Sequence, residues 1–410
     1  MRSKTILVGV AGVAVLGMAL AGCSSKSTET PGAAADGAVK TGQGISGTTI
    51  TLTAEVDLNG PFKVNSEDES RGYKLYWEEQ NAAGGVCETY DVKINVVSHD
   101  YDVQKAVTVF NQTSPETLAY QDFVGGSHTA AVLEEAEANN LLLSPSSTTH
   151  TVLASPVVTG TWAAYDVDLR IVFQWLLEQG EVAEGDTVGV IYNEGDYGQA
   201  ALEGAQEFAE AHDITLVEAQ VKATDSDMTA AVQSATSAGA SAVLLAGTPP
   251  QLASVATILQ GAGSDIAIGG SNPTISSSLL GTPAADYLAE HFVGVSYVTT
   301  YEEGYGKDLF DRLTEANPGA TLTSQAAIGY QKGAIMHKIL EAACAAGDLT
   351  PAGVVEARAN IGIVSLPDLG PDMDYSKLGE SPTKSGYVVT LDGAVTGGLK
   401  VVSDGLYELK

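Results

Sequence analysis

The feature that most constrains the fold of this chain is a regular alternation of short β-rich runs with longer amphipathic stretches from Thr48 onward. Strands that alternate with helices of about a dozen residues are typical of βαβ units with parallel sheets. A first set has predicted strands at 50–56, 92–98, 122–124 and 141–143, and predicted helices at 70–81, 103–111 and 129–139. A second set has predicted helices at 166–179, 198–211, 228–238 and from 251, and predicted strands at 187–192, 216–221, 242–246 and near 266. We therefore expect an α/β protein with two doubly wound, parallel-sheet lobes of similar plan.

The last part of the chain does not form a third set of this kind. Residues 329–346 are predicted to be one long helix, and 387–391 and 399–402 to be strands. We interpret these late segments as additions to the two lobes.

The N-terminus has the pattern of an export signal. After a positively charged start, residues 6–20 are uncharged and mostly apolar, and small residues then lead to Cys23. The run is short for a spanning helix and a polar tract follows it. The sequence around Cys23 resembles the lipobox of bacterial lipoproteins, which implies removal of 1–22 and a lipid anchor at the outer face of the cell membrane. Residues 23–45 would then be a flexible tether, although an ordinary cleaved signal with an incidental cysteine is the alternative.

The charge balance of the chain is strongly acidic. It has 20 Lys and Arg against 51 Asp and Glu, a net charge of −31. Loss of 1–22, with its two basic residues, would take the net charge to −33. Such a surface repels nucleic acid and anionic lipid, so we expect no nucleic-acid partner. We interpret the charge as an acidic, solvated exterior.

Two further cysteines, Cys87 and Cys344, remain beyond the lipidation candidate. Two thiols in an oxidising compartment suggest one disulfide, and two separate buried thiols are the alternative.

Signatures of catalysis are missing from the sequence. It has no Gly-x-Ser-x-Gly elbow, no phosphate-binding loop with Gly-Lys-Ser/Thr, and no His-Glu-x-x-His metal helix. The acidic clusters at 67–69 and 225–227 miss calcium-loop spacing, and we interpret them as solvated turns and helix caps. No histidine is at metal-ligand spacing to another. We expect a protein that is not an enzyme, with no metal and no cofactor.

Small polar residues gather where two consecutive predicted strands end. The segments 125–129 and 144–148 both fall at the carboxyl edge of a parallel sheet, where ligands bind. Hydroxyls and free backbone N–H groups at a helix N-terminus suit a carboxylate or another small anion, although Ser and Thr also serve as helix caps. The candidate ligand-binding residues are Ser127, His128, Thr129, Ser146, Ser147 and Thr148.

Six short motifs carry a resemblance to a known family. In chain order they are Leu58-Asn-Gly-Pro61, Asn81-Ala-Ala-Gly-Gly-Val86, Val124-Gly-Gly-Ser127, Leu143-Ser-Pro-Ser-Ser-Thr148, Asp196-Tyr-Gly198 and Ala246-Gly-Thr-Pro249. The chain resembles the type I solute-binding lipoproteins of ATP-driven importers, specifically the branched-chain amino acid (leucine, isoleucine and valine) binding group. The resemblance covers the chain from about Thr48 to the C-terminus.

The resemblance implies an architecture and a function. Three crossing segments would join the lobes near 158–165, 294–300 and 366–386. Lobe 1 would comprise 46–160 and 300–370, and lobe 2 would comprise 166–295 and 386–410. The protein would be a monomeric, lipid-anchored, solute-binding component of an ABC importer that delivers a small molecule to a membrane permease. Alternatives are a ligand-sensing receptor of the same fold with a signalling partner, and an exported hydrolase using Ser127 and His128.

The resemblance also implies roles for particular residues. It brings Cys344 close to Cys87, which favours their pairing. Residues 127–129 and 146–148 would hold a ligand carboxylate, and Tyr197 would cover the ligand from lobe 2. Further candidates are Asn65, Trp162, Gln220 and Thr248. The family's acidic partner for a ligand ammonium has no clear equivalent near Glu218 and Gln220, so an amino acid, an amide and a small organic acid all stay open.

Overall fold

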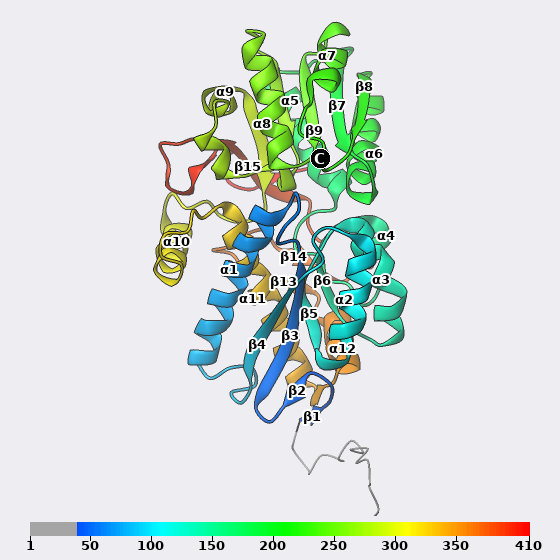
Figure 1. Cartoon of the computed structure of the whole chain (residues 1–410), viewed down its shortest axis with the longest axis vertical. Helices are drawn as coiled ribbons and strands as arrows, with labels where there is room; N and C mark the ends of the chain where they lie inside the picture. The colour runs from blue at the N-terminus through cyan, green and yellow to red at the C-terminus, as the bar shows by residue number, and fades with distance from the viewer. Residues whose placement is uncertain (1–38) are drawn as a thin grey trace, which may run out of the picture.

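Two sheets, one in each lobe, organise residues 39–410, the part of the chain that the computed structural model describes. Figure 1 shows the lobes one above the other along the long axis of the molecule. The expected export signal 1–22, Cys23 and most of the expected tether lie outside the described residues. No helix within 39–410 is both long and apolar enough to cross a membrane.

Lobe 1 is built on a mainly parallel sheet with β3 (Thr49–Val56) at its centre. On one side of β3 lies β4 (Asp91–Ser98), and on the other lie β5 (Ala119–Val124) and then β6 (Leu143–Ser146). The connecting helices are α1 (Lys63–Ala82), α2 (Val103–Thr113) and α3 (Gly126–Ala138), with η1 (Ser114–Glu116) after α2. The strands carry residues such as Ile50, Leu52 and Phe123, which are fully buried in the core of this lobe.

The folded part of lobe 1 begins inside the segment expected to be a tether. Strand β1 (Lys40–Thr41) pairs with β12 (Asp348–Leu349), and β2 (Ile45–Ser46) pairs with β3. The Gln43 side chain also donates hydrogen bonds to backbone oxygens of the loop before β5. Residues from Lys40 onward are therefore fixed to lobe 1, whereas the sequence predicted a tether up to 45.

The chain returns to lobe 1 late in the sequence through α10 (Gly304–Ala316), α11 (Ser324–Ala345) and α12 (Pro351–Asn360). Helix α11 packs along α1, and a Cβ atom at Gly329 would lie only 2.0 Å from the backbone oxygen of Glu69. Glycine is thus needed for this close approach. Cys87, just after α1, forms a disulfide with Cys344 near the end of α11, with their Cα atoms 6.1 Å apart. The pairing implied by the resemblance is confirmed.

Lobe 2 has a larger sheet in the order β8, β7, β9, β10, β11, β15, β16. The first five strands are parallel to one another, β15 is antiparallel to β11, and β16 is antiparallel to β15. They are β7 (Thr187–Asn193), β8 (Thr215–Val221), β9 (Ala242–Ala246), β10 (Ala267–Gly270), β11 (Phe292–Ser296), β15 (Ser385–Leu391) and β16 (Leu399–Val401), and β17 (Tyr407–Glu408) pairs with β15. The helices are α5 (Tyr165–Gln179), α6 (Asp196–Ala211), α7 (Thr229–Ser237), α8 (Pro249–Gly261) and α9 (Ala285–His291). The short helices are η2 (Asn272–Thr274), η3 (Ser277–Gly281) and η4 (Thr396–Gly398).

Three segments connect the lobes. The first lies between α4 (His150–Leu153) and α5, the second between β11 and α10, and the third between the β13–β14 pair (Ile363–Val364 and Met373–Asp374) and β15. They hydrogen-bond to one another: the Thr299 N–H donates to Leu369 O over 2.7 Å, and the Tyr375 hydroxyl donates to Gly160 O over 2.7 Å. The crossings are therefore one bonded unit.

Several element boundaries differ from the sequence-based predictions. Helix α1 begins at Lys63 rather than 70, and β6 covers 143–146 rather than 141–143. Helices α10 and α12 were not predicted. The early start of α1 has a tertiary cause, because its polar first turns are buried. Asp68 Oδ2, for example, accepts hydrogen bonds from the Thr323 backbone N–H over 2.8 Å and from its hydroxyl over 2.7 Å.

Candidate functional site

A cavity lies between the lobes, at the carboxyl ends of β5 and β6 and facing the start of α6. Its empty volume, including its mouth, is about 470 Å³. The aromatic residues of its lining are Phe62, Tyr101, Trp162, Tyr165 and Tyr197. The polar side chains of its lining are Asn65, Ser66, Glu69, Ser146, Asn272 and Gln325. Both lobes and the first crossing segment therefore contribute to one site.

Tyr197 forms part of the lobe 2 wall. Its hydroxyl donates to Gly247 O over 3.1 Å or bonds to Ser271 Oγ at 2.6 Å. Burial raises the pKa of the Tyr197 hydroxyl well above its ordinary value. Its ring centroid lies 4.6 Å from that of Tyr165. The hydroxyl is thus fixed within lobe 2 while the ring faces the cavity, which leaves an apolar surface for a ligand.

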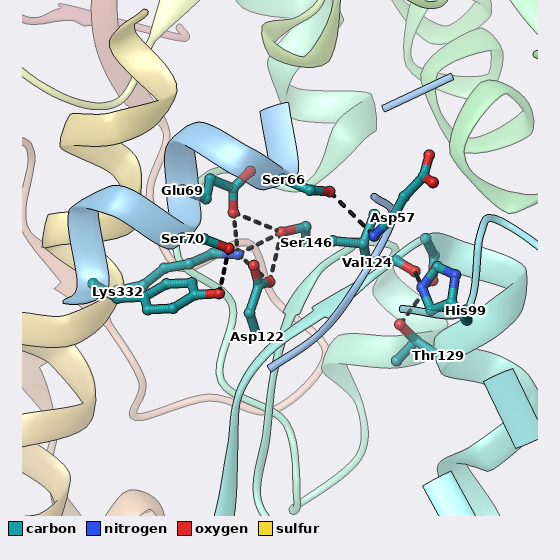
Figure 2. Close-up of polar contacts among 12 residues, drawn as sticks. Asp57, Ser66, Glu69, Ser70, His99, Asp122, Val124, Thr129, Ser146 and Lys332 are labelled. Atoms are coloured by element: carbon teal, nitrogen blue, oxygen red, sulfur yellow. Dashed lines mark hydrogen bonds and ion pairs between the residues drawn. The ribbon is translucent and has the colours of Figure 1, made fainter. Parts of the chain in front are cut away.

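The floor of the cavity holds a buried ionic group, the Lys332 cluster, which consists of Lys332, Glu69, Asp122 and Ser146 (Figure 2). Lys332 Nζ lies 2.6 Å from Glu69 Oε2, 2.6 Å from Asp122 Oδ1 and in contact with Ser146 Oγ. The side chains of Lys332 and Asp122 are fully buried. The ring of Trp162 lies over the ammonium, with its centroid 5.2 Å from Nζ. The cluster joins α1, β5, β6 and α11 at one point.

Charges within the Lys332 cluster shift each other's protonation. Burial lowers the pKa of Lys332, but the two carboxylates outweigh it and the net shift is upward. Burial raises the pKa of Glu69 to about 7, even though Lys332 acts in the opposite direction. Lys332 therefore stays charged near neutral pH, and the cluster changes from a net negative charge to neutrality when Glu69 takes up a proton. Within 39–410, no group of three or more His, Cys, Asp or Glu is placed to hold a metal ion.

The two lobes also touch beside the cavity. The Asn65 amide in α1 donates to Pro273 O in η2 over 3.3 Å. Asn272, which precedes Pro273, is held from within lobe 2. Its backbone N–H donates to Asp168 Oδ2 over 2.9 Å, and its side-chain amide donates to Val295 O over 3.0 Å. Burial raises the pKa of Asp168 to about 7. The structure therefore has its lobes in contact over the cavity.

The cavity brings together four of the residues that the sequence analysis proposed for ligand binding. Ser146, Tyr197, Asn65 and Trp162 all line it. The Ser146 hydroxyl accepts from Lys332 and lies 3.0 Å from Glu69 Oε2 and 2.9 Å from Asp122 Oδ1, so its one proton is directed to a carboxylate. Ser146 is thus part of the floor of the cavity, and its single donor is already used by a protein carboxylate.

The other lobe 1 candidates lie outside the cavity lining. The hydroxyl of Thr129 donates to Gly125 O over 2.8 Å, and that of Thr148 to Ala163 O over 2.8 Å. Ser147 is fully buried. Ser127 and His128 line an adjoining groove, which shares Tyr101, Gly126 and Tyr197 with the cavity lining.

The pair of Ser127 and His128 does not form a nucleophile and base. The His128 ring stacks on His99 with centroids 4.6 Å apart, and neither of its nitrogens has a hydrogen-bond partner among the described residues. A serine nucleophile needs a base within hydrogen-bond reach. The arrangement gives no support to a hydrolase.

The two remaining lobe 2 candidates also lie away from the cavity. Gln220 is exposed on β8. Thr248 begins α8 in a capping box: its hydroxyl accepts from the Gln251 backbone N–H over 3.4 Å, and its own N–H donates to Gln251 Oε1 over 2.8 Å. Thr248 therefore has a structural role at a helix start.

The sequence analysis missed Glu69, Asp122 and Lys332. It interpreted 67–69 as a solvated turn or cap, which is wrong because Asp68 is fully buried and Glu69 only 3% exposed, both within α1. The 225–227 cluster is exposed, with Asp225 and Asp227 accepting from nearby backbone N–H groups, as interpreted. One signal for Lys332 was present, namely a lysine amid the small and apolar residues of α11.

Comparisons with known proteins agree with this geometry. Residues 49–397 match the model of a family described as periplasmic binding protein. A fatty acid ABC transporter substrate-binding protein from Thermomonospora curvata is 32% identical, with 92% of this chain and 96% of that one covered and a TM-score of 0.87. No curated protein sequence matches the chain.

More distant structures share the fold. A branched-chain amino acid ABC transporter protein from Thermus thermophilus with bound valine is 14% identical, with 88% and 96% of the two chains covered and a TM-score of 0.74. A branched-chain amino acid transporter substrate-binding protein from Streptococcus pneumoniae in complex with isoleucine is 18% identical, with 86% and 99% covered and a TM-score of 0.70.

The fold and the cavity between its lobes define a solute-binding protein of the type I periplasmic binding class. The chain belongs to the periplasmic binding protein family, of the ABC transporter type.

Proposed function

We propose that this protein is the extracytoplasmic substrate-binding component of an ABC importer, which captures a small molecule between its lobes and delivers it to a membrane permease. The observation that carries the proposal is the cavity itself, because aromatic side chains from both lobes enclose it. The lipid anchor at Cys23 and the monomeric state belong to the same proposal, supported by the N-terminal sequence pattern and by the family resemblance.

Ligand capture would work by closure of the lobes about the three crossing segments. A molecule that touches both Trp162 and Tyr197 has more contacts when the lobes are together than when they are apart. It would therefore shift the equilibrium toward the closed form, which the permease would recognise. Contacts such as that between Asn65 and Pro273 would stabilise this form.

The lining of the cavity suits a ligand with an apolar body and one polar end. Five aromatic rings provide the apolar surface, and two polar residues of the lining, Glu69 and Ser146, belong to the Lys332 cluster. The names of similar proteins point to two ligand classes, fatty acids and branched-chain amino acids. An amino acid, an amide and an organic acid, including one with an alkyl tail, all have this general form.

A thermal-shift screen followed by a fluorescence titration tests the proposal. A true ligand at about a hundred times its Kd should add roughly 2.7 kcal/mol to the free energy of unfolding. The same ligand should change the fluorescence of Trp162, and Trp162→Phe should remove that change. Trp175→Phe is the matched control, because Trp175 packs on Tyr407 and does not line the cavity. If stabilising solutes left the Trp162 signal unchanged, the interlobe cavity would not be the binding site.

A further inference from the structure

We infer that the cavity selects an uncharged polar group, a carboxamide or a protonated carboxyl, whose N–H or O–H Glu69 accepts and whose carbonyl oxygen accepts from Trp162 and Gln325. The inference rests on the proposed function and names the chemistry of the bound solute.

No cation in the cavity lining is free to pair with an ionised carboxylate. None of the described residues that line it is Lys, Arg or His. Lys332, directly below, has three ammonium protons and three acceptors, which are Glu69 Oε2, Asp122 Oδ1 and Ser146 Oγ. The N-terminus of α3, at Gly125 and Gly126, offers only about half a positive charge, against a full negative charge on Glu69. While Glu69 is ionised, an anionic ligand therefore meets net repulsion.

Glu69 offers one free acceptor to the cavity. Its Oε2 atom accepts from Lys332 and lies within reach of the Ser146 hydroxyl. Its Oε1 atom makes no hydrogen bond within residues 39–410, and Figure 2 shows this oxygen turned away from Lys332. Since Glu69 lines the cavity, a ligand donor is the partner that Oε1 lacks.

Two unpaired donors belong to other residues of the same lining. Trp162 Nε1 and Gln325 Nε2 are both buried and have no hydrogen-bond partner in the described part of the chain. The residues are 3% and 2% exposed, so water does not readily satisfy them. Buried donors of this kind are normally paired in proteins. A carbonyl oxygen would pair them, whereas an ammonium group would leave both unsatisfied.

A carboxyl ligand and Glu69 together must share one proton. When the acid binds, a single hydrogen lies between its oxygen and Glu69 Oε1, whichever of the two groups brought it. The raised pKa of Glu69, about 7, is consistent with a proton being available there in neutral solution. Above that pH both groups are ionised in free solution, so binding requires uptake of one proton. A carboxamide carries its own N–H and requires none.

Calorimetric titration of the purified protein at pH 6.5 and 8.5 tests the inference. The ligands are hexanamide, hexanoate and hexylamine, together with their aromatic counterparts phenylacetamide, phenylacetate and phenethylamine. We expect hexanoate affinity to fall roughly 25-fold between these pH values, with uptake of one proton at the higher pH. Hexanamide affinity should not fall between these pH values, and hexylamine should bind more weakly than hexanamide at both of them.

Two variants separate the Glu69 acceptor from the net charge of the cluster. Glu69→Gln supplies a donor in place of the charged acceptor, so hexanoate should bind with no fall at pH 8.5. Asp122→Asn removes the same amount of charge from a residue that does not line the cavity, and in this variant the hexanoate affinity should still fall between pH 6.5 and 8.5. The wild-type pH series does not depend on either variant folding.

The outcomes are distinct. Hexanoate binding more tightly than hexanamide at pH 8.5, or hexylamine binding most tightly, would overturn the inference and leave the proposed function intact. If the protein bound none of these compounds but bound another solute in the cavity, the inference would also be overturned and the proposed function would stand. If no solute bound there at all, both would fail.

Discussion

Glu55 gives the sharpest test of the packing described for lobe 1. It lies in β3, is fully buried, and neither carboxylate oxygen has a hydrogen-bond partner among residues 39–410. Burial raises its pKa from an ordinary 4.5 to about 8. Glu55 is therefore mostly neutral in the folded protein at pH 7, whereas it is ionised in the unfolded chain.

The sign of the resulting pH dependence follows from proton binding. Because the pKa is raised on folding, Glu55 contributes stability that is fully present below pH 4.5 and is lost as pH rises toward 8. Each pH unit well within this window costs about 1.36 kcal/mol. Between pH 5 and 7 the loss comes to about 2–3 kcal/mol, since the unfolded carboxyl is still partly protonated at pH 5. Glu55→Gln abolishes this loss because the amide does not titrate.

Urea unfolding at pH 5 and at pH 7 measures the effect. The free energy of unfolding of Glu55→Gln, relative to wild type, should rise by about 2–3 kcal/mol between the two pH values. Glu134→Gln, at an exposed position in α3, controls for loss of a carboxylate from the surface. A Glu55→Gln difference that stayed the same at both pH values would show that Glu55 has a partner or reaches solvent, and the argument from burial would be refuted.

Three further changes test the contacts that position the cavity. Lys332→Met leaves Glu69 and Asp122 buried without a cation, so it should lower the free energy of unfolding at neutral pH by about 3–5 kcal/mol in urea titrations. Lys338→Met, at an exposed position on the same helix, is the control and should change the free energy of unfolding little. Replacing both Cys87 and Cys344 by Ser should cost about 2–5 kcal/mol by the same assay, and an unchanged stability would contradict a structural role for the disulfide. Gly329→Ala should lower the melting temperature, because its Cβ would meet the α1 backbone at 2.0 Å, while Gly261→Ala, with open space around it, should not.

Much of the fold could be predicted because it follows from local pattern. The alternation of β-rich runs and amphipathic helices places most strands of both sheets, and buried strands such as 242–246 match in full, although β11 was not predicted. The family resemblance supplied what local pattern could not, namely the closeness of Cys344 to Cys87, 257 residues apart. Such long-range pairing cannot be read from spacing alone.

The site was harder to predict for a physical reason. Polar strand ends indicated the right edge of the sheet, and Ser146 and Tyr197 do line the cavity. Hydroxyls of Thr129 and Thr148, however, satisfy nearby backbone oxygens, a local alternative that sequence cannot distinguish from ligand binding. Glu69 looked like a surface carboxylate because its cation, Lys332, lies 263 positions further along the chain. Its burial depends on the packing of α11 against α1, which no local pattern reveals.

A crystal structure of the protein grown with a solute that stabilises it tests the central claim most directly. The account predicts electron density for that solute enclosed between Trp162 and Tyr197, with its polar end at Glu69. Density for the solute at any other place, with the interlobe cavity holding only water, would contradict it.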